Sequence, residues 1–360
     1  MPDVPAPAQR VQAFDLARGL AVLFMVAVHV LQTFATPEVY DSPFGWAIDF
    51  LGGPPAAPVF VFLMGAVLAF SRHAGTWQLV RRGVLLLALA YALNALRGSL
   101  PVWIALQAGV PASDLGGTTP IRELLIVDIL HFAGMACLLL AIVRRLTQKP
   151  WVWIVLAASI ATVSPWIWGT MSGWPPLDFV LTLLWGMGDE AVAFPVFSWL
   201  VFPLVGMAVG KWLDTSSDPG QTLRRAAWAG AGLLLVGGVL TVTDVSFHLG
   251  DYWRTGPGGL MAIAGFVLFW VWLCDLVAAY VLPTAVGRIL AFWSRHVTAF
   301  YFIHWVLIGW SVLLVGYEVL GIPGTLIGML AILAASDLLT RIWIWLLTTG
   351  RKGPSHRTGK

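Results

Sequence analysis

The sequence predicts an all-α fold, a polytopic bundle of about ten membrane-spanning helices with both termini in the cytoplasm. Three observations lead to this prediction. Of the 360 residues, 59% are hydrophobic and only 11% are charged, whereas about 25% of a soluble domain is charged. Apolar runs of about 20 residues, long enough to cross the hydrocarbon core, recur along nearly the whole chain. Lys and Arg also fall mainly in alternate connections, as expected when basic residues stay on the cytoplasmic side.

Ten apolar runs are expected to span the bilayer. Helices are predicted because backbone groups in lipid must pair within the segment, and these runs lack the alternation of a membrane barrel strand. The sixth run contains Gly206 and Gly210, a spacing of small residues that lets another helix approach closely. The predicted spans are 13–35, 47–71, 79–97, 122–143, 150–169, 195–213, 226–244, 257–282, 289–311 and 322–347.

The basic residues are unequally divided between the two sides of this bundle. With the N-terminus inside, an even number of spans places both termini in the cytoplasm. The cytoplasmic connections then hold the pairs Arg81–Arg82, Arg144–Arg145 and Arg224–Arg225, while the outer loops keep Arg97, Arg122 and Arg254.

The chain is expected to form one membrane domain between two short tails. The predicted parts are a cytoplasmic N-terminal tail (1–12), a transmembrane domain (13–347) and a basic cytoplasmic tail (348–360). The longest outer connections, 97–121 and 170–194, are the expected outer lid.

Composition also excludes several classes of protein. The net charge of +3 comes from loop residues and forms no dense basic face, so no nucleic-acid partner is expected. The two cysteines, Cys137 and Cys274, lie inside predicted spans, so they indicate neither a disulfide framework nor a cysteine zinc site. No metal is expected.

The first span contains three ionisable residues, which are functional candidates because charge inside a bilayer is costly. Asp15 and Arg18 can pair near its cytoplasmic end, while His29 lies deeper and on the same helix face as Arg18. His29 has no polar neighbour within one turn upstream, so its partner must come from another helix or from a substrate. It is either a buried structural histidine or a reactive one, which would serve acyl transfer as a base or carry the acyl group covalently.

Two further histidines occur in the fourth and ninth spans. Asp128 and His131 share one helix face, so the carboxylate could orient the imidazole or simply neutralise it. His304 shares a face with Tyr301. The candidate catalytic residues are therefore His29, Asp128, His131 and His304.

Three arginines are candidates for binding a phosphate-bearing donor at the cytoplasmic surface. Arg81 and Arg82 open the third span, and Arg18 lies near the start of the first. Guanidinium groups suit phosphate geometry, and a donor such as coenzyme A is met only in the cytoplasm. Alternatively, Arg81 and Arg82 simply orient their span.

Several segments carry a family resemblance. They are Asp15–His29, Pro58–Gly65, Asp128–Gly134, Phe194–Pro195, Gly206–Gly210 and Tyr301–Trp305. Their order and spacing resemble membrane acyltransferases of the heparan-alpha-glucosaminide N-acetyltransferase type, and the related acyltransferase type 3 group opens similarly. The resemblance covers most of the chain.

This resemblance implies that 13–347 is a transmembrane acyltransferase domain. Acetyl-CoA or another acyl-CoA would enter from the cytoplasm, and a carbohydrate or glycolipid acceptor would offer a hydroxyl or amine from the other side. The other expected partner is membrane lipid, and the expected location is the bacterial cytoplasmic (inner) membrane.

The resemblance also implies roles for individual residues. By similarity to the type 3 group, His29 takes the place of the first-helix catalytic histidine and Arg18 that of the preceding arginine. Arg81 and Arg82 correspond to the basic site opening the third helix, although the usual two arginines separated by two residues are absent. Residues 36–50 also lack the histidine that eukaryotic glucosaminide enzymes carry before the second helix.

Two other functions fit the same residues. A transporter or flippase would use the intramembrane His, Asp and Arg side chains as a substrate or proton path. In a non-catalytic assembly protein, replacing the three histidines would leave the function intact but lower the stability.

Overall fold

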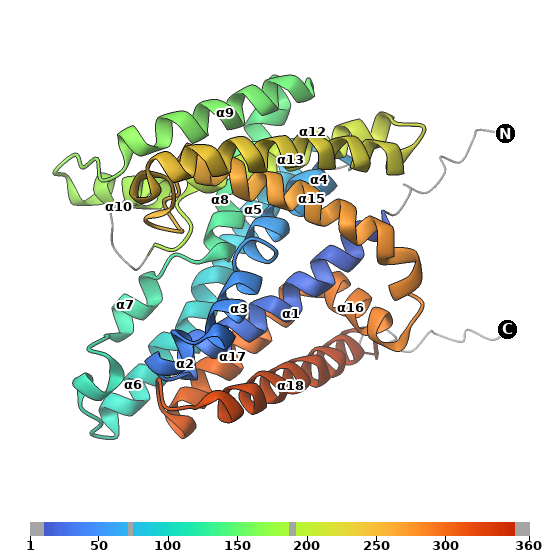
Figure 1. Ribbon diagram of the computed structural model, residues 1–360. Coiled ribbons are helices and arrows are strands. Elements are labelled where there is room, and N and C mark those ends of the chain that lie inside the picture. The colour runs from blue at the N-terminus through green and yellow to red at the C-terminus, as the bar shows by residue number, and fades with distance from the viewer. Residues whose placement is uncertain (1–10, 71–74, 187–191, 350–360) are drawn as a thin grey trace, which may run out of the picture.

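The computed structural model describes residues 11–70, 75–186 and 192–349 (Figure 1). Most of the two predicted tails lies outside the described residues, and so does part of the predicted outer lid at 170–194. Within the described ranges the chain is helical, as predicted, and its β-structure is limited to two isolated bridges.

Ten helical segments among the described residues are long and apolar enough to cross a bilayer, which confirms the predicted number. The first turn of α1 and the last turn of α18 lie at one end of the bundle (Figure 1), called here the cytoplasmic end after the distribution of Lys and Arg. The helices are α1 (Gln12–Phe34), α2 (Pro37–Tyr40), α3 (Pro43–Gly52), α4 (Ala57–Phe70), α5 (Thr76–Asn94), η1 (Ala95–Ser99), α6 (Leu100–Gln107), η2 (Ala112–Leu115), α7 (Pro120–Leu125), α8 (Ile129–Leu146), α9 (Pro150–Ile167), α10 (Pro175–Trp185), α11 (Val196–Trp199), α12 (Val201–Thr215), α13 (Pro219–Thr243), α14 (Val245–Leu249), α15 (Pro257–Val281), α16 (Ala285–Arg295), α17 (Val297–Val315) and α18 (Ile322–Thr349).

Several of the spans differ in detail from the prediction, among them the fourth, which begins at Ile129 after the separate helix α7, and the seventh, which begins at Pro219. The second is broken between α3 and α4, where Pro54 and Pro55 lack a backbone N–H and restrict the residue before them. The third does not end at Arg97 but continues through η1 and α6 to Gln107. The ninth begins at Val297, after a separate helix α16.

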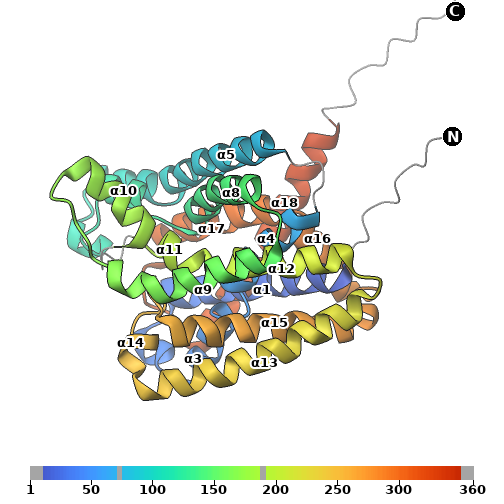
Figure 2. The same cartoon turned by 90° about the horizontal axis from the view of Figure 1, so that it is seen from above.

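Helix α1 lies at the centre of the bundle. It packs against α3, α4, α15, α16, α17 and α18, and most of its residues are buried. Seen from above, α5 and α8 lie on one side of the molecule and α13 and α15 on the other (Figure 2). Residues carried by α1 therefore meet side chains from distant parts of the sequence.

Helices α4 and α12 pack closely, as the glycine spacing predicts. A Cβ at Gly206 would lie 2.0 Å from the Phe62 carbonyl oxygen, and one at Gly210 would lie 2.3 Å from that of Ala66. Since no side chain fits there, these glycines set the separation of the two helices.

A second irregular segment lies between α7 and α8. Its carbonyl groups are satisfied by neighbours: the Asn94 amide donates to the carbonyls of Leu124 and Ile126 at 3.0 and 2.6 Å, and the Ala193 N–H donates to that of Val127 at 3.0 Å. Irregular backbone is tolerated inside a membrane protein when protein groups pair with it. This segment leads directly to Asp128.

Candidate active site

Helices α1 and α17 bring two of the predicted histidines together. His29 Nδ1 lies 3.0 Å from His304 Nε2, and the two ring planes are within 8° of each other. His304 is fully buried, whereas His29 is half-buried and lines a cavity. The partner that His29 required from another helix is therefore His304.

The hydrogen bonds indicate which ring nitrogens carry protons. His304 Nδ1 lies 3.2 Å from the Phe300 carbonyl oxygen, and since a carbonyl can only accept, Nδ1 is the donor. With both rings neutral, His304 Nε2 then accepts from His29 Nδ1–H. This assignment leaves the lone pair of His29 on Nε2, as a general base requires.

Asp128 is held at the start of α8 by three groups. Its Oδ1 accepts from the Ile129 N–H at 2.6 Å, which makes Asp128 the N-cap of the helix. Its Oδ2 accepts from the Tyr301 hydroxyl at 2.6 Å and forms an ion pair with Arg97 Nη1 at 2.8 Å. Helices α8 and α17 and segment η1 therefore meet at one carboxylate.

Arg97 reaches this carboxylate from a short π-helix, η1. Its side chain is only 9% exposed, and its guanidinium lies 4.3 Å from the centre of the Trp305 ring. Trp305 also contacts His29, at a ring-centre distance of 4.2 Å. π-Helical turns are often found at functional sites, because the extra residue redirects side chains.

His131 is close to Asp128 but is not oriented by its carboxylate. The His131 Nδ1 accepts from the backbone N–H of Asp128 at 3.2 Å, and its ring packs edge-on against Tyr91. Its Nε2 is buried without a hydrogen-bond partner among the described residues. The sequence allowed the carboxylate to orient or neutralise His131, but the carboxylate instead contacts Arg97 and Tyr301.

A cavity of about 590 Å³, called here the central cavity, borders these groups. Its inner wall includes His29, Asp128 and Tyr301, and the rest is mainly apolar. Gly53 and Pro54, in the break between α3 and α4, also line it, as expected for irregular backbone at membrane depth.

Two tyrosines line another part of the central cavity. The Tyr40 hydroxyl donates to Asp49 Oδ1 at 2.9 Å. Burial, followed by the nearby Asp49 carboxylate, raises the pKa of Tyr40 to about 12 and also raises the pKa of Tyr252. Both hydroxyls therefore stay protonated and can donate hydrogen bonds. The hydroxyl of Tyr252 is buried and has no partner within the described part of the chain.

The three arginines predicted to hold a donor lie on two different helices. Arg18 lies between α1 and α16, where its Nη1 is 3.5 Å from the Ser294 hydroxyl, which in turn donates to Asp15 at 3.2 Å. Arg81 and Arg82 are exposed on the first turns of α5. These residues lie toward the cytoplasmic end, but the catalytic candidates and the arginines remain separate groups.

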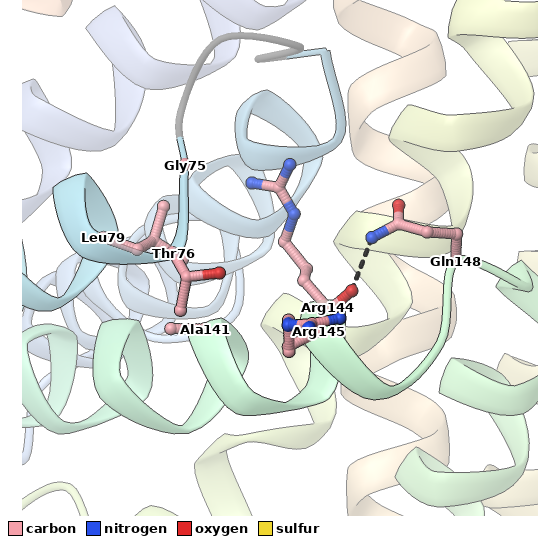
Figure 3. Close-up of a pocket in the computed structure, with 7 residues that line it drawn as sticks. All are labelled: Gly75, Thr76, Leu79, Ala141, Arg144, Arg145 and Gln148. Carbon is pink, nitrogen blue, oxygen red and sulfur yellow. Dashed lines mark hydrogen bonds between the residues drawn. The ribbon is translucent and has the colours of Figure 1, made fainter.

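A basic pocket of about 340 Å³ occurs instead between the start of α5 and the end of α8, and we call it the α5–α8 pocket. Arg144, Arg145 and Gln148 come from the α8 side, and Gly75 and Thr76 from the α5 side (Figure 3). The first backbone N–H groups of a helix favour anions, as do guanidinium groups. The chemistry of this pocket therefore fits phosphate.

Sequence reasoning missed Arg97, Trp305 and the α5–α8 pocket. Arg97 was assigned to an outer loop, although the apolar stretch that follows it was a signal that the helix continues. Tyr301 was noted only for sharing a face with His304. In the described residues, no group of three or more His, Cys, Asp or Glu side chains is arranged to hold a metal ion.

The fold and these contacts define an integral membrane protein with a buried, hydrogen-bonded centre of His, Asp, Arg and Tyr side chains beside a cavity. The family model described as "Heparan-alpha-glucosaminide N-acetyltransferase, catalytic" matches residues 10–239. The chain belongs to this family, a family of membrane acyltransferases, which confirms the resemblance seen in the sequence. No curated protein matches the chain. The matched region contains His29, Arg97 and Asp128 and ends before α17, which supplies His304.

Proposed function

We propose that this protein transfers an acetyl or other acyl group from cytoplasmic acyl-CoA to a hydroxyl or amine of a carbohydrate-like acceptor, in the bacterial cytoplasmic membrane. The observation that carries the proposal is the His29–His304 pair. It gives His29 a proton-accepting Nε2 beside a cavity and fixes the ring through Nδ1. A positioned imidazole of this kind accelerates proton transfer by about 10²–10⁴-fold.

In this proposal His29 removes the proton from the acceptor as its oxygen or nitrogen attacks. When bound, acyl-CoA supplies the thioester carbonyl that receives the nucleophile. His29 then returns the proton to the departing sulfur, so the ring is regenerated in each cycle. His304 does not line the central cavity and acts as a positioning residue, holding His29 in one tautomer.

Asp128 and Tyr301 line the cavity next to His29. The Asp128 carboxylate stabilises positive charge on the His29 ring when it is protonated. Arg97 offsets that carboxylate while the ring is neutral, so the centre carries little net charge between reactions. His131 supports Asp128 by accepting a hydrogen bond from the Asp128 backbone N–H.

The donor is proposed to bind at the cytoplasmic end. The α5–α8 pocket supports this, because Arg144 and Arg145 can pair with phosphates there. Arg144 lies 16 residues after Asp128, about 24 Å along the chain of α8. A long, flexible donor is needed to join the two sites. Arg18, Arg81 and Arg82 remain predicted alternatives for the same role.

The test uses purified protein in lipid nanodiscs with acetyl-CoA and a panel of sugars and amino sugars. CoA release is followed with a thiol reagent, and the acceptor is examined by mass spectrometry. The expected result is CoA release that depends on the acceptor, with one acetyl group added per CoA. Release with no acetylated acceptor, or solute movement without any acyl donor, would contradict the proposal, and the latter would favour the transporter.

A further inference from the structure

The mouth of the central cavity is apolar. Four apolar residues both line the cavity and are exposed, and they therefore mark its opening: Trp46 (63% exposed), Phe50 (53%), Leu234 (41%) and Leu249 (44%). Gln32 is the one exposed polar residue among the described lining residues. An opening toward water would more often be rimmed by charged and polar side chains.

The mouth extends from the outer end of the bundle, where Leu249 lies on α14, down to membrane depth. Leu234 is nine residues from the outer end of α13, and the lining residue Phe266 is nine residues from the outer end of α15. Nine residues of helix correspond to about 14 Å, close to half of the roughly 30 Å hydrocarbon core. The next residue on α13, Leu235, is 69% exposed. Helix α13 packs along α15, and α3 reaches α15 through the contact between Phe50 and Phe266. On the side of Leu234 the opening therefore faces lipid.

An aromatic surface continues from the mouth toward the cytoplasmic end. Phe50 on α3 packs edge-on against Phe266 at a ring-centre distance of 5.7 Å, and Phe266 stacks with Trp270 at 6.0 Å. Trp270 in turn contacts Phe24 of α1 at 6.2 Å. Hydrocarbon chains pack well on such an apolar surface.

The interior of the cavity has the opposite character. It presents Asp49, Asp128 and the hydroxyls of Tyr40 and Tyr252, and the described lining contains no Lys or Arg. Asp128 is already paired with Arg97, but the half-buried Asp49 carboxylate has no Lys or Arg beside it on the described lining. It therefore disfavours a phosphate, whereas hydroxyl and amine groups can donate to it. The buried, unpartnered Tyr252 hydroxyl provides a donor for an oxygen of the ligand.

From these observations we propose that the acceptor is a membrane lipid whose headgroup carries free hydroxyl or amine groups and no phosphate, and that it enters the central cavity sideways from the bilayer. The headgroup lies among Asp49, Tyr252 and His29, and the chains leave between α3 and α13. This inference rests on the proposed acyl transfer and selects its substrate class.

The experiment compares the same sugar with and without lipid chains. Protein in phosphatidylcholine nanodiscs receives labelled acetyl-CoA and either glucosyl or glucosaminyl diacylglycerol in the disc, or the matching methyl glycoside in solution. The label is expected in the organic extract, with kcat/KM for the lipid acceptor at least about tenfold higher. Phosphatidylglycerol, which offers hydroxyls beside a phosphate, is expected to remain unlabelled.

Two matched variants test the route of entry. Leu234→Trp narrows the mouth, whereas Leu235→Trp adds the same side chain on neighbouring surface that does not line the cavity. Leu234→Trp is expected to raise KM for the lipid acceptor about tenfold without changing KM for acetyl-CoA, and Leu235→Trp should leave both unchanged.

Three results would count against the inference. Equal or faster labelling of the methyl glycoside would overturn it while leaving acyl transfer intact, and so would labelling of phosphatidylglycerol at the rate of the glycolipid. Equal effects of the two tryptophan variants would remove the sideways route. A protein that transfers no acetyl group to any acceptor would instead refute the proposed function, and the inference would fall with it.

Discussion

The buried centre and the cytoplasmic end use polar residues differently. In the centre, Asp128 contacts Arg97, Tyr301 and the Ile129 N–H, all within 2.8 Å, and His29 is bonded to His304. At the cytoplasmic end the guanidinium groups are more open to solvent: Arg81, Arg82 and Arg145 are exposed, and Arg144 is half-buried.

This difference shows which side chains are held in one geometry before a substrate binds. A charge in the bundle interior is tolerated only when it is paired, so each partner in the centre is held in one geometry, and such preorganised groups are effective in catalysis. Exposed cations are hydrated and screened by salt, so they suit capture of a charged donor more than chemistry. Substitutions in the two regions should therefore affect different measured quantities.

The largest effect is expected for His29→Ala. Loss of the general base should lower kcat for acetyl transfer by about 10²–10⁴-fold, because proton removal from the acceptor is no longer assisted. The KM for acetyl-CoA should change little, since the donor phosphates are bound elsewhere. Steady-state CoA release measures both quantities.

His248→Ala is the matched control. His248 is also buried, but its Nδ1 accepts from the Gly258 N–H at 3.0 Å, outside the centre. Its loss should destabilise the protein by about 1–3 kcal/mol while leaving the activity of the folded fraction unchanged. Similar kcat losses in the two variants would show that His29 acts only through stability.

The next largest effect is expected for the buried ion pair between Arg97 and Asp128. Arg97→Leu leaves the Asp128 carboxylate buried without its cation and should lower the free energy of unfolding by about 3–5 kcal/mol. The double variant Arg97→Leu/Asp128→Leu should recover much of that loss but not the activity. In contrast, Lys211→Leu, which removes a partly exposed pair with Asp214 at 3.5 Å, should cost about 1 kcal/mol or less. Thermal unfolding in one detergent compares all three, and equal losses for Arg97 and Lys211 would refute the distinction between buried and exposed pairs.

A smaller effect is expected at His304. His304→Ala removes the acceptor of the His29 Nδ1 proton and should reduce kcat about tenfold, the equivalent of one hydrogen bond, with KM for the donor unchanged. His304→Gln offers a side-chain oxygen that can accept the same proton and should restore part of the rate. If Gln and Ala lower kcat equally, His304 does not act by holding the His29 ring.

Much of the fold could be predicted from the sequence, because every membrane span must be long and apolar enough on its own to cross the lipid. Each run had to be about 20 residues long and apolar, so the ten segments could be recognised without knowing their packing. The breaks were less visible. The turn at Pro54 and Pro55 lies within an apolar run, and the extension beyond Arg97 was indicated only by the short apolar stretch that follows it.

Three members of the centre could also be predicted, but Arg97 and the contacts between the members could not. His29, Asp128 and His304 were identifiable because ionisable residues in a membrane span are energetically costly and are therefore functional candidates. That His304 pairs with His29, and that Asp128 pairs with Arg97 and not with the His131 ring, depends on how α1, η1, α8 and α17 pack. Whether these residues carry the reaction is still a prediction.

The smallest effect, at the cytoplasmic end, decides between two arginine groups. Arg144→Ala/Arg145→Ala should raise KM for acetyl-CoA roughly fivefold, because a guanidinium that is open to solvent contributes at most about 1 kcal/mol to phosphate binding. The increase should shrink in high salt. KM for acetyl-pantetheine, which lacks the nucleotide phosphates, should not change, and neither should kcat.

Two other pairs of arginines complete this comparison. Arg224→Ala/Arg225→Ala removes the same charge from an exposed pair outside the α5–α8 pocket, so it separates local binding from the general attraction of a basic surface. Arg81→Ala/Arg82→Ala tests the site expected from the sequence. If only Arg81→Ala/Arg82→Ala raises KM for acetyl-CoA, the donor binds at Arg81 and Arg82 and not in the α5–α8 pocket. If all three raise KM equally, the cytoplasmic end attracts the donor without holding it at one place, and only the buried centre is a defined site.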